Sequence, residues 1–225
     1  MPKGVLIISD TRETDLKGNI TSDQKRKIVN IAPFCYLATA GSESTFYAAR
    51  ILRNCLYNKS SIESINKNVL ELYKKVNGIY KEVNYHPVGP IMLAQYNNSS
   101  EKFKLFHIDP QVNDYECLTE ATYLTSIGAN PFIRQNIETK IKKLIAGLNK
   151  NINSDSIHEI IAKNVHHYYK RLSIPTIGKN IFVVYLTTNG GKPASANFFV
   201  NQQDQLFNID KSQNSEFITF KNKSN

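Results

Sequence analysis

The chain opens with Gly4-Val-Leu-Ile-Ile-Ser-Asp10-Thr-Arg12, and it continues through Lys25-Arg-Lys27 to Pro33-Phe-Cys-Tyr-Leu-Ala-Thr-Ala-Gly41. The first apolar run is short and ends in polar residues, which predicts a buried strand with Asp10 at its end. A second strand is predicted over 32–40, with the basic cluster ahead of it and a turn at Gly41 behind it. These stretches place an acid, a base and a glycine turn in a defined order at the edges of two strands.

Length and composition indicate one globular domain. The 225 residues are 41% hydrophobic, enough for one sizeable core, and we expect a single domain over residues 1–209 with a polar C-terminal tail at 210–225 that frays. The longest apolar run, 181–186, is far shorter than the roughly 20 residues that cross a bilayer. Asp10 interrupts the first apolar run before a signal-peptide core forms. We therefore expect a cytoplasmic protein with no membrane partner.

The charge of the chain and its cysteine and histidine residues exclude several classes of partner and ligand. The formal charge is +9, but the basic residues are scattered and no aromatic-interleaved motif accompanies them, so no specific nucleic-acid partner is expected. The three cysteines argue against a disulfide framework and are read as small buried hydrophobes. His158, His166 and His167 fall on different faces of one predicted helix. We expect neither a metal site nor a cofactor.

Hydrophobic periodicity predicts the remaining elements. Helices are predicted after a cap at Ser42 or Ser44, after a capping box at Ser60-Ser-Ile-Glu63, after Asn130-Pro131, and after a second box that starts near 154–156 and includes Glu159. The predicted strands lie at 90–96, 103–108, 115–118, 121–125, 181–188 and 196–200, the last two joined by a hairpin at Asn189-Gly190-Gly191. Helix pairs between antiparallel strands indicate an α/β (α+β) fold, a four-layer α/β/β/α sandwich of two antiparallel sheets.

The chain resembles the proteasome β-type subunits, which are N-terminal nucleophile hydrolases, and most closely the bacterial proteasome-related family Anbu. The opening stretches carry the resemblance together with Phe103-Lys-Leu-Phe-His-Ile-Asp-Pro110, Ile127-Gly128 and Arg171-Leu-Ser-Ile-Pro-Thr-Ile-Gly178. It covers roughly residues 4 to 190 in order with few gaps. Its weight comes from the order and spacing of these motifs, because each motif alone is only moderately specific.

The resemblance implies a catalytic site. Asp10 matches the active-site aspartate of the family, and Lys27 matches its lysine after one extra residue in the Asp15–Gly18 turn. Gly41 matches the glycine whose backbone N–H serves the oxyanion hole, and Ser173 matches Anbu. Acyl transfer by an N-terminal hydroxyl needs a nucleophile, a base, a positive group and oxyanion donors.

Other readings of these residues stay open. Asp10 can cap a turn after a strand, Lys27 can belong to a solvated basic run, and Gly41 can be there because the turn needs a positive φ. The stretch around Ser173 also lacks the second aspartate of proteasome subunits.

Two functional hypotheses follow. In the family the nucleophile is the first residue of the mature chain, a strand and a turn before the aspartate, whereas Met1-Pro2-Lys3 precede the strand here. We expect that strand to be missing from this sequence and the form written here to be inactive. The first hypothesis is a threonine-type peptidase or amidase subunit that acts on peptide or amide substrates. The alternative is a non-catalytic relative. In both, the partner is the protein itself, as a homo-oligomer.

Overall fold

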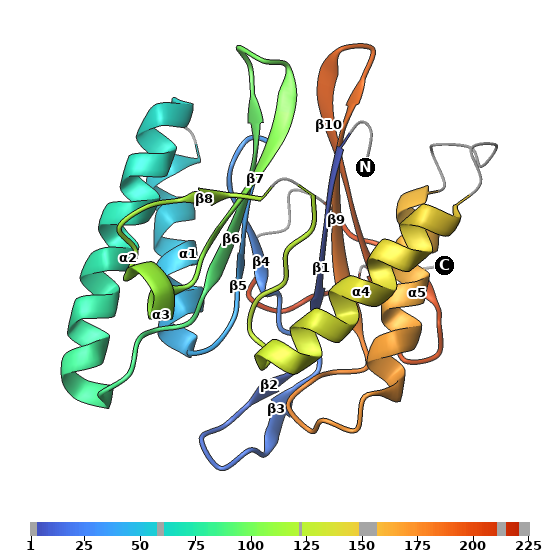
Figure 1. Ribbon diagram of the computed structural model, residues 1–225, viewed down its shortest axis with the longest axis horizontal. Coiled ribbons are helices and arrows are strands. Elements are labelled where there is room, and N and C mark those ends of the chain that lie inside the picture. Colours follow the sequence, from blue (N-terminus) through green and yellow to red (C-terminus); the bar gives the residue numbers. More distant parts are fainter. Residues whose placement is uncertain (1–3, 58–60, 122, 149–156, 211–214, 221–225) are drawn as a thin grey trace. The chain divides into compact units, whose positions relative to one another are not determined.

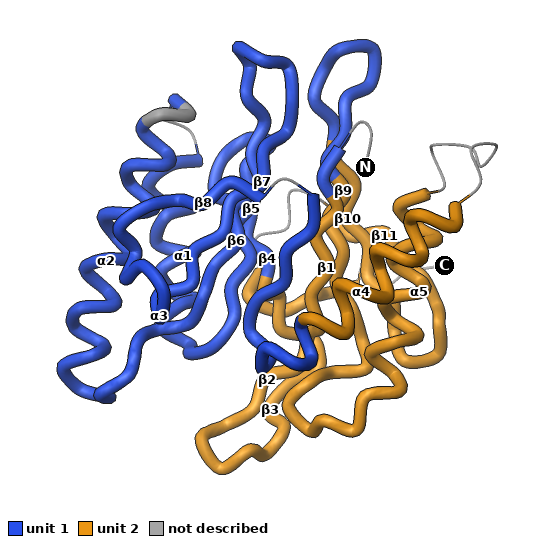
Figure 2. The backbone as a smooth tube through the Cα atoms, in the orientation of Figure 1, with its two compact units in different colours: residues 1–5, 28–134, 186–194 blue, residues 6–27, 135–185, 195–225 orange. Residues whose placement is uncertain are grey.

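The computed structural model describes residues 4–57, 61–121, 123–148, 157–210 and 215–220. Backbone contacts divide the chain into two compact units, which Figure 2 distinguishes by colour. Unit 1 comprises 1–5, 28–134 and 186–194, and unit 2 comprises 6–27, 135–185 and 195–225. Each unit therefore combines segments that are far apart in the sequence. The expectation of a single domain over 1–209 stays a prediction.

Unit 1 contains an antiparallel sheet with two long helices (Figure 1). Its strands follow one another in the order β4 (Ile28–Ala32), β5 (Cys35–Thr39), β6 (Ile91–Asn97), β7 (Lys102–Ile108) and β8 (Thr119–Glu120). Its helices are α1 (Glu43–Leu56), α2 (Ile62–Asn84) and the single turn α3 (Pro110–Asn113). Apolar side chains from one face of α1 and α2 pack against β4, β5 and β6 in one buried cluster. The amphipathic spacing of the two helices produces this core.

Unit 2 contains most of a second sheet and its own helix pair. The strand order is β1 (Gly4–Asp10), β9 (Ile181–Asn189), β10 (Lys192–Val200) and β11 (Leu206–Asn208), with β2 (Glu13–Thr14) and β3 (Ile20–Ser22) forming a separate hairpin. Ala162 of α5 (Ile157–Arg171) packs against apolar residues of β9 and β10. Next to α5 lies α4 (Pro131–Gly147), where Lys140 Nζ is 4.1 Å from the centre of the Tyr168 ring (Figure 1).

The structure confirms the mixed α/β class and several of the predicted elements. Strands β6, β7, β9 and β10 lie where the period-2 pattern predicts them. Pro131 begins α4, and Asn130 caps it by accepting the Ile133 N–H through Oδ1 at 3.0 Å. Ser42 is the N-cap residue of α1, although its side chain makes no capping hydrogen bond. The capping box predicted near 154–156 lies outside the described residues.

Three predicted strands and one predicted helix cap differ from the structure. The strand predicted over 32–40 is the shorter β5, because a tight turn in which Phe34 has φ +53° separates it from β4, a strand for which no prediction was made. The strands predicted at 115–118 and 121–125 are replaced by the short β8, because Asp114 and Tyr115 have positive φ and turn the chain. The N-cap residue of α2 is Ser61 rather than Ser60, and its hydroxyl accepts the Ser64 N–H.

The tail and the cysteines also differ from expectation. Residues 215–220, expected to fray, include Ile218, which is 1% exposed, and Phe217, which pairs with Lys25 in a β-bridge. A buried apolar side chain and paired backbone groups hold this segment in place. Cys35 is buried as predicted, but Cys55 and Cys117 are exposed. None of the helices in the described parts of the chain combines the length and apolar character needed to cross a bilayer.

Candidate functional site

Asp10 and Lys27 form an ion pair in unit 2. Asp10 ends β1, Lys27 directly precedes β4, and the lysine Nζ lies 2.9 Å from Oδ1 and 3.0 Å from Oδ2 of the carboxylate. Both side chains are largely covered, at 23% and 19% exposure. The basic run is therefore not a solvated stretch, since the neighbouring Lys25 and Arg26 are buried as well.

Two backbone donors fix the orientation of the Asp10 carboxylate. Its Oδ1 accepts the Arg12 N–H at 2.9 Å and the Gly178 N–H at 3.1 Å. The first of these bonds closes a turn directly after β1, as the turn-capping reading of Asp10 predicts. The second reaches across 168 residues of sequence to the loop after α5. Asp10 thus caps a local turn and also joins two distant segments of the chain.

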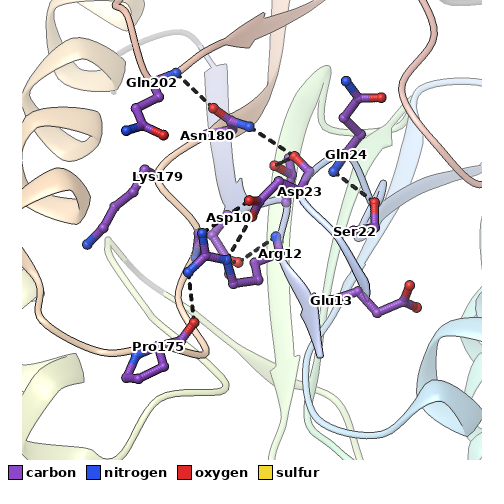
Figure 3. Close-up of polar contacts among 12 residues, drawn as sticks. Asp10, Arg12, Glu13, Ser22, Asp23, Gln24, Pro175, Lys179, Asn180 and Gln202 are labelled. Carbon is purple, nitrogen blue, oxygen red and sulfur yellow. Dashed lines mark hydrogen bonds and ion pairs between the residues drawn. The ribbon is translucent and has the colours of Figure 1, made fainter. Parts of the chain in front are cut away.

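The Arg12 side chain joins three segments around Asp10 (Figure 3). Its Nε and one terminal nitrogen donate to the two carboxylate oxygens of Asp23 at 2.7 and 3.1 Å, a bidentate pair. Its other terminal nitrogen donates to the Pro175 carbonyl at 2.8 Å. The hydrogen bond to Asp23 raises the pKa of Arg12 above its ordinary value. This clamp ties the loop that carries Gly178 to the segment that follows Asp10.

Lys179 ties the same loop to the C-terminal end of α5. Its Nζ donates to the backbone carbonyls of Tyr169, at 3.1 Å, and of Leu172, which lie at the C-terminal end of α5. A cation at this end of a helix satisfies carbonyls that have no partner within the helix. Burial, with a further contribution from the charge of Asp10, raises the pKa of the Tyr169 hydroxyl.

Ser173 follows α5 in the same loop as Gly178 and is exposed. Within this loop, it is the Gly178 N–H that donates a hydrogen bond to Asp10. Gly178 and Arg12 lie within motifs that the sequence singles out, but a backbone N–H carries no residue-type signal. Sequence reasoning therefore assigned no site role to either residue. The oxyanion role expected for Gly41 and the role expected for Ser173 stay predictions.

Gly41 lies in unit 1 and has the conformation that its turn requires. Its φ is +89°, and a Cβ there would come within 2.7 Å of the Gly89 Cα. The reverse approach is tighter, because a Cβ on Gly89 would come within 1.7 Å of the Ala40 carbonyl oxygen. The Gly89 N–H donates to the Thr45 hydroxyl at 2.8 Å. These contacts explain the glycine at residue 41 by backbone geometry, whichever chemistry it serves.

The arrangement supplies a covered carboxylate–ammonium pair. Such a pair can hold a neighbouring proton acceptor in place, and the positive charge of the lysine lowers the pKa of titratable groups beside it. Within the described residues, the hydrogen bonds that the Asp10 carboxylate accepts come from nitrogen donors, namely Lys27 and the backbone N–H groups of Arg12 and Gly178. The same part of the chain contains no group of three His, Cys, Asp or Glu side chains that could hold a metal ion.

No protein-family model matches the chain, and no curated protein matches it either.

Proposed function

We propose that this chain is a proteasome-type, Anbu-like subunit of the N-terminal nucleophile hydrolases, in which Asp10 and Lys27 belong to an amide-hydrolysing site. The observation that carries the proposal is the Asp10–Lys27 ion pair, together with the two backbone N–H groups that orient the carboxylate. An acid and a base 17 residues apart in sequence meet with both carboxylate oxygens engaged. The resemblance pairs the same two residues.

The fold is part of the proposal. A pair of helices accompanies each of the two larger sheets, α1 and α2 in unit 1 and α4 and α5 in unit 2. Two such sheets stacked face to face, with the helix pairs outside, would form the four-layer α/β/β/α sandwich. We propose that stacking for this chain.

In the proposed reaction, an N-terminal hydroxyl or thiol attacks the carbonyl carbon of an amide substrate. Lys27, held by Asp10, lowers the proton affinity of the groups around the nucleophile, and the Gly41 N–H stabilises the developing oxyanion. The proton of the nucleophile passes to the free α-amino group of the same residue, which returns it to the nitrogen of the leaving amine as the tetrahedral intermediate collapses. Water then hydrolyses the acyl bond, which releases the acyl group as a carboxylic acid and regenerates the nucleophile. Ser173 is a further polar group on the loop after α5, and its part in this site is also proposed.

Self-assembly in the cytoplasm completes the proposal. Among the described residues, β1 is an edge strand of its sheet with β9 as its neighbour. An open strand edge recruits a further strand, either from the same chain or from another copy. Sedimentation of the protein at micromolar concentration should show species heavier than the 25.6 kDa monomer. A monomer alone would contradict this part of the proposal.

A covalent-labelling experiment tests the enzymatic part. Native protein is analysed by intact mass and N-terminal sequencing, then incubated with a peptidyl electrophile. A first residue that is Thr, Ser or Cys and carries the adduct would support the proposal, and Lys27→Ala should abolish the reaction. Lys17→Ala, an exposed lysine in the β2–β3 turn, is the matched control and should react normally.

The same experiment distinguishes the enzymatic proposal from the alternative of a non-catalytic relative. A native protein that assembles but forms no adduct, and that has no nucleophile at its first residue, is the non-catalytic structural homologue. Hydrolysis that is insensitive to Lys27→Ala would overturn the site assignment itself.

A further inference from the structure

We propose that the C-terminal segment 215–220 is a positioning element for the Asp10–Lys27 pair, acting through Lys25. The proposal rests on the proposed function only in treating that pair as a site. The segment begins 205 residues after Asp10 in sequence, yet it contacts the residues directly before Lys27.

The segment pairs with the backbone just before Lys27. Phe217 forms a β-bridge with Lys25, the Arg26 N–H donates to the Glu216 carbonyl at 2.9 Å, and the Ile218 N–H donates to the Gln24 carbonyl at 2.8 Å. On the other side of the same backbone, the Lys25 N–H donates to the Thr11 carbonyl at 2.9 Å. Thr11 directly follows Asp10, so residues 24–26 are held between the segment and the chain next to the carboxylate.

Side chains reinforce this arrangement around Lys25. Its side chain is 4% exposed, and its Nζ pairs with Glu13 at 2.5 Å and with Glu216. The same Nζ lies 5.3 Å from the centre of the Phe217 ring. Burial by itself would lower the pKa of Lys25, but the bonds to the two glutamates outweigh it, so Lys25 stays protonated and keeps both contacts.

The far end of the segment is anchored in the second sheet. Ile218 is 1% exposed, and the Phe220 ring lies 5.3 Å from that of Phe199 and 4.9 Å from that of Phe207, on β10 and β11. The segment therefore links these strands to residues 24–26. Because Lys27 continues the same backbone, displacement of the segment should let its side chain move away from Asp10.

A charge reversal tests the link. Glu216→Lys places two cations together at Lys25, and Glu116→Lys is the matched control, because it reverses the same charge in the exposed pair with Lys74. Two readouts report the site: the acylation rate of Lys27, followed by mass spectrometry, and amide hydrogen exchange at Arg12 and Gly178, the two backbone donors to Asp10. Amide exchange at Ile218 reports whether the segment itself has been released.

Glu216→Lys should increase Lys27 acylation and the exchange at Arg12 and Gly178 on the order of tenfold, the effect expected when bonds to a charged group are lost. Glu116→Lys should leave the Lys27 acylation rate and the amide exchange at Arg12 and Gly178 unchanged. Glu216→Asp keeps the carboxylate, so these three rates should stay close to those of the native protein. If Glu216→Lys does not fold, Phe217→Leu tests the same link by removing the ring beside Lys25 while keeping the backbone bridge.

The proposal would be overturned if amide exchange at Ile218 became fast while Lys27 acylation and amide exchange at Arg12 and Gly178 did not change. The segment would then be released without any effect on the Asp10–Lys27 pair. Neither readout requires hydrolysis or an electrophile. A negative result here therefore leaves the proposed function standing, and failure of the electrophile to label the protein leaves this inference standing.

Discussion

Gly178 lies directly against the backbone of Arg12. A Cβ at residue 178 would come within 2.9 Å of the Arg12 Cβ and 3.0 Å of the Arg12 nitrogen. Both residues also donate their backbone N–H to the same Asp10 oxygen. The loop after α5 can therefore reach Asp10 only because residue 178 has no side chain.

We expect Gly178→Ala to push the loop away from Asp10. The new methyl group would overlap the Arg12 backbone, and the predicted loss of unfolding free energy is about 1–3 kcal/mol. Thermal unfolding measures the loss, and the amide resonance of residue 178 reports its hydrogen bond to Asp10. Gly78→Ala in α2, where a Cβ meets nothing within 4 Å, is the control and should be neutral or stabilising. Equal stability of the two variants would contradict this account of the loop.

The glycine pair of unit 1 predicts a larger effect. In Gly89→Ala the methyl group would lie 1.7 Å from the Ala40 carbonyl oxygen, a backbone atom that cannot rotate away. We expect a loss of about 3 kcal/mol or more in chemical denaturation, because the turn at Gly41 must move as a whole. Gly147→Ala, which adds a methyl group in open space at the end of α4, should cost far less. A stable Gly89→Ala protein would mean that the two glycines are not in close contact.

His166 predicts a pH dependence in unit 2. Burial lowers its pKa, although the Lys179 carbonyl, 2.7 Å from Nε2, and the Asp204 carboxylate, 3.0 Å from Nδ1, both act to raise it. The Lys179 carbonyl can only accept, so its contact with Nε2 is a hydrogen bond when that nitrogen carries a proton, and the Asp204 contact at Nδ1 favours the protonated ring. NMR titration should give a pKa below the ordinary value of about 6.5. Asp204→Asn should lower it further, since it removes a charge that favours the protonated ring.

The lowered pKa of His166 determines how its contribution to stability changes with pH. The folded protein binds a proton at His166 less readily than the unfolded chain does, so this contribution is fully present above a pH of about 6.5 and is lost as the pH falls through the folded pKa. Unfolding midpoints at pH 7 and at mildly acidic pH, compared with those of His166→Gln, measure it. A loss of equal size in both proteins would assign the acid sensitivity to other groups.

Periodicity predicted the elements whose apolar residues face one core. The faces of α1 and α2, with β6 and β7, line the buried cluster of unit 1, and β9 and β10 contribute to that of unit 2. It failed where the chain turns at residues with positive φ, as at Phe34, Asp114 and Tyr115, because hydrophobic periodicity carries no signal for such turns. The buried position of Ile218 was missed because Phe217, Ile218 and Phe220 form too short an apolar run, within a polar tail, to establish a period.

Some residues of the candidate site could be identified from the sequence, and others only from the structure. Asp10 and Lys27 could be proposed from sequence because the resemblance matches them to an aspartate and a lysine of the family, and side-chain identity is visible in a sequence. The contribution of Gly178 comes from its N–H, which every residue except proline carries, so only the structure identifies it. Arg12 stands between these cases, since its motif is visible but its contact with the Pro175 carbonyl depends on the fold.

The contact between Lys25 and the C-terminal segment also sets an order of events during synthesis. Glu216 lies 191 residues after Lys25, and Gly178 lies 168 residues after Asp10, so the ribosome must make most of the chain before either contact exists. Contacts this distant in sequence form late and slow the folding of a domain. A nascent chain would therefore carry Asp10 and Lys27 early in synthesis without the contacts that position them, and any chemistry of the pair would be delayed until residue 216 had been added.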